Sequence, residues 1–207
     1  NGVIVTAPTC GAAGIVPDAF CGDADTASAS SLAWAEDASA PVRIFPPAKD
    51  DTDLTLAFRC MRELAGLGVE QGVVARGTSS PRGSGRPSVT VTCASGGRPD
   101  HALAVYGVLA DNADLSPRLV EDGFECRVLS PAGTASWELG EAAVGREFSF
   151  VALADATVAS ERGMRWELDH FHVDALRDRG ISNVVDGPRA AVRCDGGVLA
   201  AFLLPAR

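Results

Sequence analysis

Two different hydrophobic patterns follow one another along the chain. In the first half, short apolar runs typical of buried strands alternate with apolar residues spaced three and four positions apart, as in a helix. Strands are expected at residues 3–5, 19–21, 42–45, 73–75 and 89–93. Helices are expected over residues 54–65, ending at Gly66, and over residues 99–110, beginning at Pro99. This alternation predicts a mainly parallel α/β sheet.

After about residue 118 the pattern changes to short runs and to alternation with a period of two, separated by turns that contain glycine. Strands are expected at residues 126–129, 136–139, 148–153, 190–194 and 198–204. Several short strands between Gly and Pro favour a β-sandwich over a continuation of the α/β fold. The predicted organisation is therefore an α/β domain over residues 1–117 and a β-sandwich domain over residues 118–207.

Composition and charge exclude several classes of protein. Of the 207 residues, 46% are hydrophobic, which supplies enough apolar surface for a core and excludes a disordered chain. The net charge of -9 argues against a nucleic-acid partner, because such binding depends on neutralising phosphates with Lys and Arg. No apolar run approaches the roughly 20 residues that cross a bilayer. The six cysteines are scattered singly, as expected of reduced thiols in a cytoplasmic protein.

Carboxylates are concentrated in two segments of the first half. Asp23 and Asp25 follow the strand at residues 19–21, at the edge where α/β folds bind ligands. Their oxygens suit Mg²⁺, although such a pair is also common in turns and helix caps. The second segment runs from Lys49 to Asp53 and opens the first helix. Capping explains acidic residues there, yet three carboxylates within four residues exceed what a cap requires. Because Lys49 is the only lysine, a Walker A loop is excluded.

A glycine turn leads from the strand at residues 89–93 into the second helix, with the sequence Ala-Ser-Gly-Gly-Arg-Pro-Asp-His. The turn at Gly97 and the helix N-terminus can present N–H groups to a phosphate, and Arg98 can form a bidentate contact with one. Asp100 is poorly placed for an anion unless it holds a metal or orients a nucleophile. An ordinary turn with a buried pair of Asp100 and His101 is an equally good interpretation.

The β-rich half contributes a tryptophan in a polar setting. Trp166 lies in Gly-Met-Arg-Trp-Glu-Leu and can stack on a flat cationic ring, although a tryptophan on a strand is more often part of the core. A second motif, Gly-Ile-Ser-Asn, ends at Ser182 and Asn183. His170 and His172 alternate on one expected strand, and we interpret them as surface imidazoles because no third metal ligand is in view.

Taken together, these segments resemble the thiamine pyrophosphokinase (thiamine diphosphokinase) family and follow its order. The shared motifs are Pro-Asp followed by Gly-Asp-x-Asp-Thr, Lys-Asp-x-Thr-Asp-Leu, Gly-Gly-Arg-x-Asp-His, Gly-Met-Arg-Trp-x-Leu and Gly-x-Ser-Asn. The resemblance runs from about Gly14 almost to the end of the chain. Five motifs in order make it highly specific.

The resemblance implies transfer of a pyrophosphoryl group from ATP to the hydroxyl of thiamine in the cytoplasm, giving AMP and thiamine diphosphate. It also implies a homodimer with thiamine bound at the subunit interface. The implied cluster that holds Mg²⁺ and the triphosphate consists of Asp23, Asp25 and Asp53, with Asp50 and Asp100. The implied ATP contacts are Thr52, Gly97, Arg98 and His101. Trp166 would stack on thiamine from the partner subunit, with Ser182 and Asn183 hydrogen-bonding it, and Asp100 is our candidate for accepting or orienting the hydroxyl proton.

The chain departs from the family pattern in its first half. The usual Ala-Asp-Gly-Gly-like motif is replaced by residues 5–11, which contain no Asp, and we expect sequence to be missing before Asn1. Leu56 stands where the family often has Lys, and Ala24 where it has an aromatic residue. Residues 77–88 resemble an inserted loop.

Two alternative functions stay open at this point. One is a pyrophosphokinase that acts on another alcohol, such as a hydroxymethyl-pterin. The other is a thiamine- or nucleotide-binding homologue without turnover, supported only by the missing Asp and by Leu56. A glycosyltransferase with a D-x-D motif is disfavoured, because that class would not explain residues 96–101 or the β-rich half.

Overall fold

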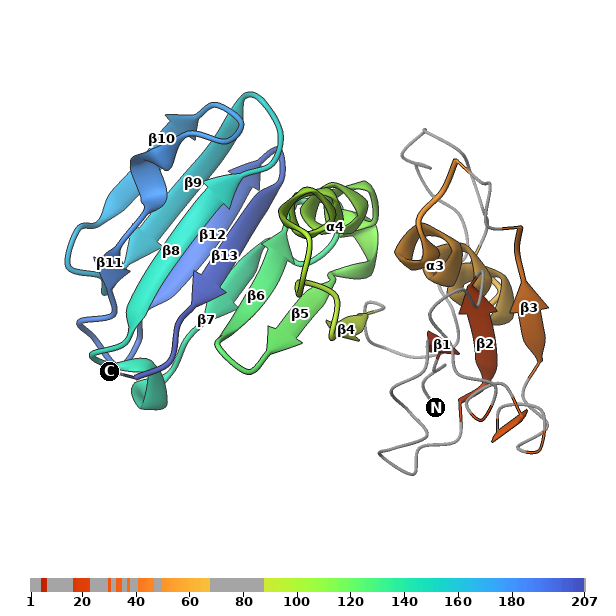
Figure 1. The fold of residues 1–207 in the computed structure, drawn as a ribbon. Helices are drawn as coiled ribbons and strands as arrows, with labels where there is room; N and C mark the ends of the chain where they lie inside the picture. Colours follow the sequence, from red (N-terminus) through yellow and green to blue (C-terminus); the bar gives the residue numbers. More distant parts are fainter. Residues whose placement is uncertain are drawn as a thin grey trace. The chain divides into compact units, whose positions relative to one another are not determined.

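The computed structural model describes residues 5–6, 17–22, 30, 33–34, 37, 41–46, 50–67 and 88–206. The chain divides into two compact units, Asn1–Pro81 and Arg82–Arg207. Both units combine helices with strands, so the fold is mixed α/β (Figure 1). Within the described residues, every helix is too short or too polar to span a membrane.

The N-terminal unit contains a small parallel sheet. Its strands, in the spatial order β1-β2-β3, are β1 (Val5–Thr6), β2 (Ala19–Gly22) and β3 (Val42–Ile44). All four residues of the central strand are buried, as expected of an unbroken apolar run in a parallel sheet. The strands predicted at residues 19–21 and 42–45 are thus confirmed. The strand predicted at residues 73–75 lies outside the described residues.

Helix α3 (Asp53–Leu64) begins and ends where its sequence signals predict. Its N-cap is Thr52, whose hydroxyl accepts a hydrogen bond from the N–H of Thr55 at 3.3 Å. After the helix, Gly66 adopts a φ of +67°, and the N–H of Leu67 donates to the carbonyl of Arg62 at 2.8 Å. These are the features of a helix that is terminated by glycine.

The buried face of α3 differs from the predicted one. Leu56 and Cys60, four positions apart, pack with Ala19 and Cys21 of β2 in one core cluster. The helical spacing of the apolar residues predicts a stripe of Leu54, Ala57, Phe58, Met61, Leu64 and Ala65. Of these, Phe58 is buried, whereas Leu64 is 40% exposed. The helix packs against the small side chains of β2, so the helix residues that face this strand are buried. Leu56, noted above for replacing a lysine, is therefore a core residue.

The C-terminal unit contains two sheets. The six-stranded sheet has the order β11-β8-β13-β6-β5-β4, and the four-stranded sheet has the order β10-β9-β12-β7. The strands of the first are β4 (Thr90–Thr92), β5 (Arg118–Glu121), β6 (Phe124–Leu129), β8 (Glu147–Ala152), β11 (Asn183–Val184) and β13 (Leu199–Leu203). Those of the second are β7 (Ser136–Glu138), β9 (Thr157–Arg162), β10 (Leu168–Val173) and β12 (Ala191–Gly196). The parallel strands β4 and β5 are joined through α4 (Pro99–Asp111), and the other pairs in these sheets are antiparallel.

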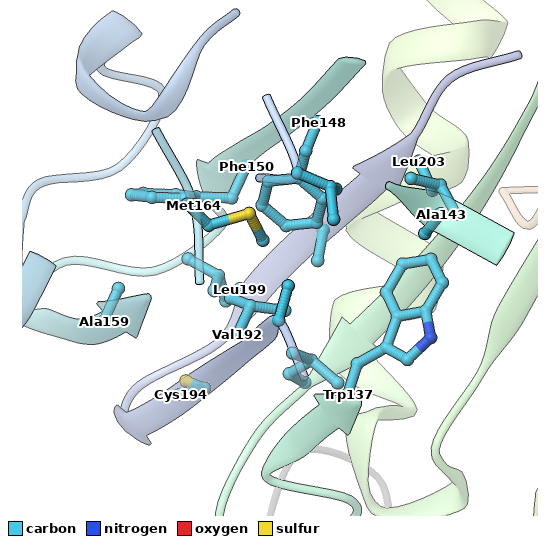
Figure 2. Close-up of a cluster of buried hydrophobic side chains, with 14 of the residues drawn as sticks. Trp137, Ala143, Phe148, Phe150, Ala159, Met164, Val192, Cys194, Leu199 and Leu203 are labelled. Atoms are coloured by element: carbon cyan, nitrogen blue, oxygen red, sulfur yellow. The ribbon is translucent and has the colours of Figure 1, made fainter. Parts of the chain in front are cut away.

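The two sheets share one hydrophobic core. Fully buried Phe148 and Phe150 of β8 pack in it with Trp137 and Val192 of the four-stranded sheet (Figure 2). Along β13, alternate residues starting at Leu199 belong to this core. The residues between them face the other side of the sheet, where the ring of Phe202 lies 5.5 Å from that of Tyr106 on α4. The six-stranded sheet is thus covered by side chains on both faces.

Most elements predicted after residue 88 are present at nearly the predicted positions. The strand and helix predicted at residues 89–93 and 99–110 are β4 and α4, and both lie in the second compact unit. The buried side of α4 is formed by Val105 and Leu109, whereas Leu103 is 60% exposed. The domain boundary after residue 117 stays a prediction.

Candidate active site

The carboxylate of Asp53 lies at the carboxyl end of β2. A methyl group on Gly22 would lie 3.4 Å from Asp53 Cγ, so the side chain lies beside the last residue of the strand. Asp53 is the first residue of α3, and capping by Thr52 fixes the backbone that carries it. Asp23 and Asp25 continue the chain after Gly22 but lie outside the described residues. The N-terminal unit therefore brings Asp53 to the strand end from which the predicted Mg²⁺ segment continues.

The neighbouring carboxylates of the second acidic segment have other surroundings. Asp51 forms an ion pair with Arg59, with 2.5 Å between Oδ2 and Nη1, and Asp50 is exposed. Below the site, burial raises the pKa of Cys21 to about 11, and Cys60 and Asp53 add to this effect. Asp51 is thus engaged in a local ion pair, while Asp53 faces the strand end.

A carboxylate organises the turn between β4 and α4. Glu121 Oε1 on β5 accepts hydrogen bonds from the N–H groups of Ala94 at 2.9 Å and Ser95 at 3.1 Å. Gly97 adopts a φ of +82°, and no described atom lies within 4 Å of the place that its Cβ would take. Glu121 therefore occupies the two N–H groups that precede the predicted phosphate cradle, and the space beside the Gly97 α-carbon is empty.

The side chains at the start of α4 form an exposed ion pair. Arg98 donates to Asp100 twice, from Nε to Oδ1 at 3.1 Å and from Nη2 to Oδ2 at 2.5 Å. These bonds, with smaller contributions from nearby backbone N–H groups, lower the pKa of Asp100 to about 2. The side chains are 69% and 61% exposed, and His101 is also exposed. The alternative interpretation of a buried pair of Asp100 and His101 is therefore wrong.

The Trp166 region is held by Asn183. The side-chain Oδ1 of Asn183 accepts the N–H of Trp166 at 3.1 Å, and its Nδ2 donates to the Trp166 carbonyl at 2.7 Å. Trp166 is 60% exposed, so it is not the core residue that the alternative interpretation describes. Ser182 is exposed with a φ of +63°, and its N–H donates to Ser149 Oγ at 3.0 Å. The structure thus brings Trp166 and Asn183 together and leaves the Ser182 side chain at the surface.

A cavity of about 230 Å³ lies beside these residues. It is lined by Trp166 and Asn183, by Gly180, by the apolar side chains of Leu168 and Ile181, and by two charged residues, Glu161 of β9 and Arg179. Glu161 also lines an adjoining hollow of about 700 Å³. A small apolar cavity with a few polar groups is the usual form of a site for an organic ring.

The two histidines on β10 give no sign of a metal centre. His170 is exposed, and its Nδ1 lies 2.7 Å from Asp169 Oδ1, which raises the pKa of the imidazole. Within the described part of the chain, three or more His, Cys, Asp or Glu side chains nowhere gather closely enough to hold a metal ion. This statement does not bear on the predicted cluster at Asp53, because Asp23 and Asp25 are not described.

Sequence reasoning missed two carboxylates. Glu121 left no signal, because its role depends on β5 lying beside β4. Glu161 left none either: it shares the buried face of β9 with Thr157 and Ala159, but this burial is visible only in the structure, because Thr-Val-Ala-Ser-Glu-Arg has no clear hydrophobic alternation.

Two family models match the chain in succession. The first, thiamin pyrophosphokinase, catalytic domain, covers residues 9–120, and the second, thiamin pyrophosphokinase, vitamin B1 binding domain, covers residues 139–199. With the fold and the site, they define the class of the protein, an enzyme of the kinase and diphosphotransferase type. The first match alone spans more than half of the chain. The chain therefore belongs to the thiamin pyrophosphokinase family, and thiamine diphosphokinase activity is the function that this membership gives it.

Solved structures show the same fold. A thiamine pyrophosphokinase from Bacillus subtilis is 21% identical, with a TM-score of 0.69 over 95% of this chain and 82% of that one. Thiamin pyrophosphokinase from Candida albicans is 13% identical, with a TM-score of 0.71 over 98% of this chain and 82% of that one. A thiamin pyrophosphokinase family protein from Enterococcus faecalis is 18% identical, with a TM-score of 0.71 over 95% and 83%. Comparison with curated protein sequences gives no significant match.

Proposed function

We propose that the chain transfers the pyrophosphoryl group of ATP to the hydroxyl of thiamine in a Mg²⁺-dependent reaction that yields AMP and thiamine diphosphate. The observation that carries the proposal is the succession of the two family models. The catalytic model spans the acidic segments and the Arg98 turn, and the vitamin-binding model spans Trp166 and Asn183. The chain therefore contains both the residues proposed to bind ATP and those proposed to bind thiamine.

In this proposal the N-terminal half is a mainly parallel α/β domain that binds the nucleotide, and the C-terminal half is a β-sandwich that binds thiamine. Support for the first comes from the parallel sheet, since α/β folds bind ligands at the carboxyl ends of their strands, where Asp53 lies. Support for the second comes from the core that the two C-terminal sheets share.

Mg²⁺ would be held by Asp53 together with Asp23 and Asp25, with Asp50 nearby in the sequence. Hard carboxylate oxygens are the donors that this ion prefers, and Asp53 places its oxygens at the strand end that leads into the other two. A bound Mg²⁺ would neutralise charge on the triphosphate. Thr52, which caps α3, would contact ATP from the same helix start.

Arg98 and Asp100 would change partners when ATP binds. Their ion pair is exposed, so the guanidinium can turn to the triphosphate at little cost, beside the open backbone of Gly97 and the exposed His101. Asp100 stays ionised in the physiological pH range even when Arg98 turns away, because the ordinary pKa of this carboxyl, 3.8, already lies well below that range. It would therefore accept a hydrogen bond from the thiamine hydroxyl and orient it.

The reaction itself is an in-line displacement. The thiamine oxygen forms a bond to the β-phosphorus, the bond from that phosphorus to the bridging oxygen breaks, AMP leaves, and the hydroxyl proton is released. Trp166 would stack on the thiamine ring, with Ser182 and Asn183 beside it. We propose a homodimer in which Trp166 serves the partner subunit's site, and its 60% exposure supports such a role. We also propose a cytoplasmic location, supported by the five described cysteines, which are free thiols.

The test is AMP release from ATP and Mg²⁺, with and without thiamine, followed by mass detection of thiamine diphosphate. Thiamine-dependent AMP together with the product is the expected result. Binding of thiamine without turnover would indicate a non-catalytic homologue. If neither binding nor turnover occurs with thiamine but both occur with a hydroxymethyl-pterin, the substrate assignment is wrong.

A further inference from the structure

Glu161 has a buried oxygen without a hydrogen-bond partner. Among the described residues, its Oε1 is the one buried side-chain oxygen or nitrogen in this state. The residue is 4% exposed, and it occupies the inward-facing side of β9 with Thr157 and Ala159. A buried carboxyl oxygen without a partner costs free energy that a hydrogen bond would recover. The position of Oε1 therefore points to a ligand that would form the missing hydrogen bond.

The neighbouring polar group, Asn183, has its hydrogen bonds satisfied by the protein. Its Oδ1 accepts two N–H groups, from Trp166 at 3.1 Å and from Val184 at 2.9 Å. Its Nδ2 donates to the Trp166 carbonyl at 2.7 Å and to Glu161 Oε2 at 3.1 Å. A primary amide has two donors and two acceptor sites, so none is left for a ligand. Asn183 is thus a positioning residue, and the group with spare capacity is Glu161.

Glu161 and Asn183 line the same cavity as Trp166. Leu168 and Ile181 supply apolar walls, and Arg179 is the other charged residue of the lining besides Glu161. Burial raises the pKa of Glu161 to about 7, against a smaller opposing effect of the bond from Asn183. The carboxyl with this pKa is therefore largely protonated below neutral pH and only partly protonated at neutral pH, and in its protonated form it can donate as well as accept.

We infer that Glu161 is a specificity-determining residue that hydrogen-bonds the aminopyrimidine edge of thiamine. This inference rests on the proposed function. A neutral carboxyl presents an O–H donor beside a carbonyl acceptor, and an aminopyrimidine presents a ring-nitrogen acceptor beside an amino donor. The two edges are complementary, and Oε2 retains an acceptor site beyond the one that Asn183 uses. Asn183 acts indirectly, by holding both Glu161 and the Trp166 backbone.

The test compares Glu161→Gln with Glu161→Met in the full chain. Glutamine keeps a donor beside an acceptor, whereas methionine keeps the size and loses both. Binding is measured by calorimetry in the absence of ATP. Two ligands are titrated separately: thiamine, and the thiamine analogue that lacks the pyrimidine amino group. Glu138→Met is the matched control, because Glu138 lines only the larger hollow.

We expect Glu161→Met to weaken thiamine binding at least about tenfold and to abolish the preference for thiamine over the analogue. Glu161→Gln and the control Glu138→Met should keep both the affinity for thiamine and the preference for thiamine over the analogue. Glu161→Met removes the unsatisfied Oε1 but also the acceptor of Asn183 Nδ2, so melting temperatures are measured and binding is compared at a temperature at which every variant is fully folded.

Two results would overturn the inference. If the unaltered protein releases AMP with thiamine and Glu161→Met retains affinity and preference, the inference is wrong and the proposed function stands. If the unaltered protein neither binds nor converts thiamine, the proposed function fails and the inference fails with it.

Discussion

Asn183 holds the backbone of Trp166 from both sides, accepting its N–H at 3.1 Å and donating to its carbonyl at 2.7 Å. Asn183→Ala should therefore affect both stability and thiamine binding. We expect the free energy of unfolding to fall by about 2–3 kcal/mol, because buried partners lose their hydrogen bonds. We also expect the thiamine KM to rise while the ATP KM stays constant, measured in steady-state kinetics.

The matched control is Asn112→Ala. Asn112 is a partly buried asparagine whose Nδ2 also donates to a carbonyl, that of Val108 at 2.9 Å, but it lies at the end of α4. Its replacement should reduce stability and leave the thiamine KM unchanged. An unchanged thiamine KM in Asn183→Ala would show that the Trp166 backbone does not need this support.

Trp166→Ala separates binding from folding. The side chain is 60% exposed, so the free energy of unfolding should change by no more than about 0.5 kcal/mol. Loss of stacking on a cationic ring should raise the thiamine KM about tenfold or more with little change in kcat. Leu176→Ala, which removes a side chain of similar exposure (65%), should change neither. A thiamine KM that does not respond to Trp166→Ala would place thiamine elsewhere.

The sequence predicted most of the described strands and the helices α3 and α4, because these carry local signals, whereas the strands β5, β9 and β11 were not predicted. Thr52 and Gly66 mark the two ends of α3, and the apolar run before Gly22 marks a buried strand. The buried face of α3 was not predictable in the same way, since it depends on the small residues of β2 that it meets. Neither was the role of Asn183: its motif indicates a polar site, but only the fold shows that its amide is used by Trp166 and Glu161.

Adjacent carboxylates should differ in their effect on activity. Asp53 faces the end of β2 at Gly22, so we expect Asp53→Asn to reduce kcat at least about a hundredfold in a folded protein, through loss of a metal ligand. Asp51→Asn breaks only the partly exposed ion pair with Arg59 and should cost no more than about 1 kcal/mol of stability, with activity retained. Circular dichroism and AMP release at varied Mg²⁺ check both. Equal activity in the two variants would remove Asp53 from the metal site.

Arg98→Lys tests the triphosphate contact. Lysine keeps the charge but cannot form the planar bidentate contact, so we expect the ATP KM to rise about tenfold with the thiamine KM unchanged. The control is Arg162→Lys, because Arg162 forms a similarly exposed ion pair, its Nη2 donating to both carboxylate oxygens of Glu138 at 2.9 and 3.0 Å. An ATP KM that rises equally in both variants, or in neither, would contradict a specific role for Arg98.

Stability should depend on pH through Glu161. Its pKa is raised to about 7 by burial, whereas in the unfolded chain it ionises near its ordinary value of 4.5. Between these values the unfolded chain releases the proton and the folded chain keeps it. The contribution of Glu161 to the free energy of unfolding is therefore fully present below about pH 4.5, because the pKa of the folded state is the higher one. It decreases as the pH rises and is lost above about pH 7. The shift corresponds to a loss of about 3 kcal/mol.

The difference between the unaltered protein and Glu161→Gln isolates this effect, because the other titrating groups are common to both. Charged side chains lining the cavities beside Glu161 include Arg162, Glu167 and Arg179, and they are also unchanged. Urea unfolding at pH 5 and pH 8 should show the unaltered protein losing more stability than the variant as the pH rises. Parallel curves for the two proteins would mean that Glu161 is ionised in the folded state at both pH values, and the neutral donor assigned to it would be wrong.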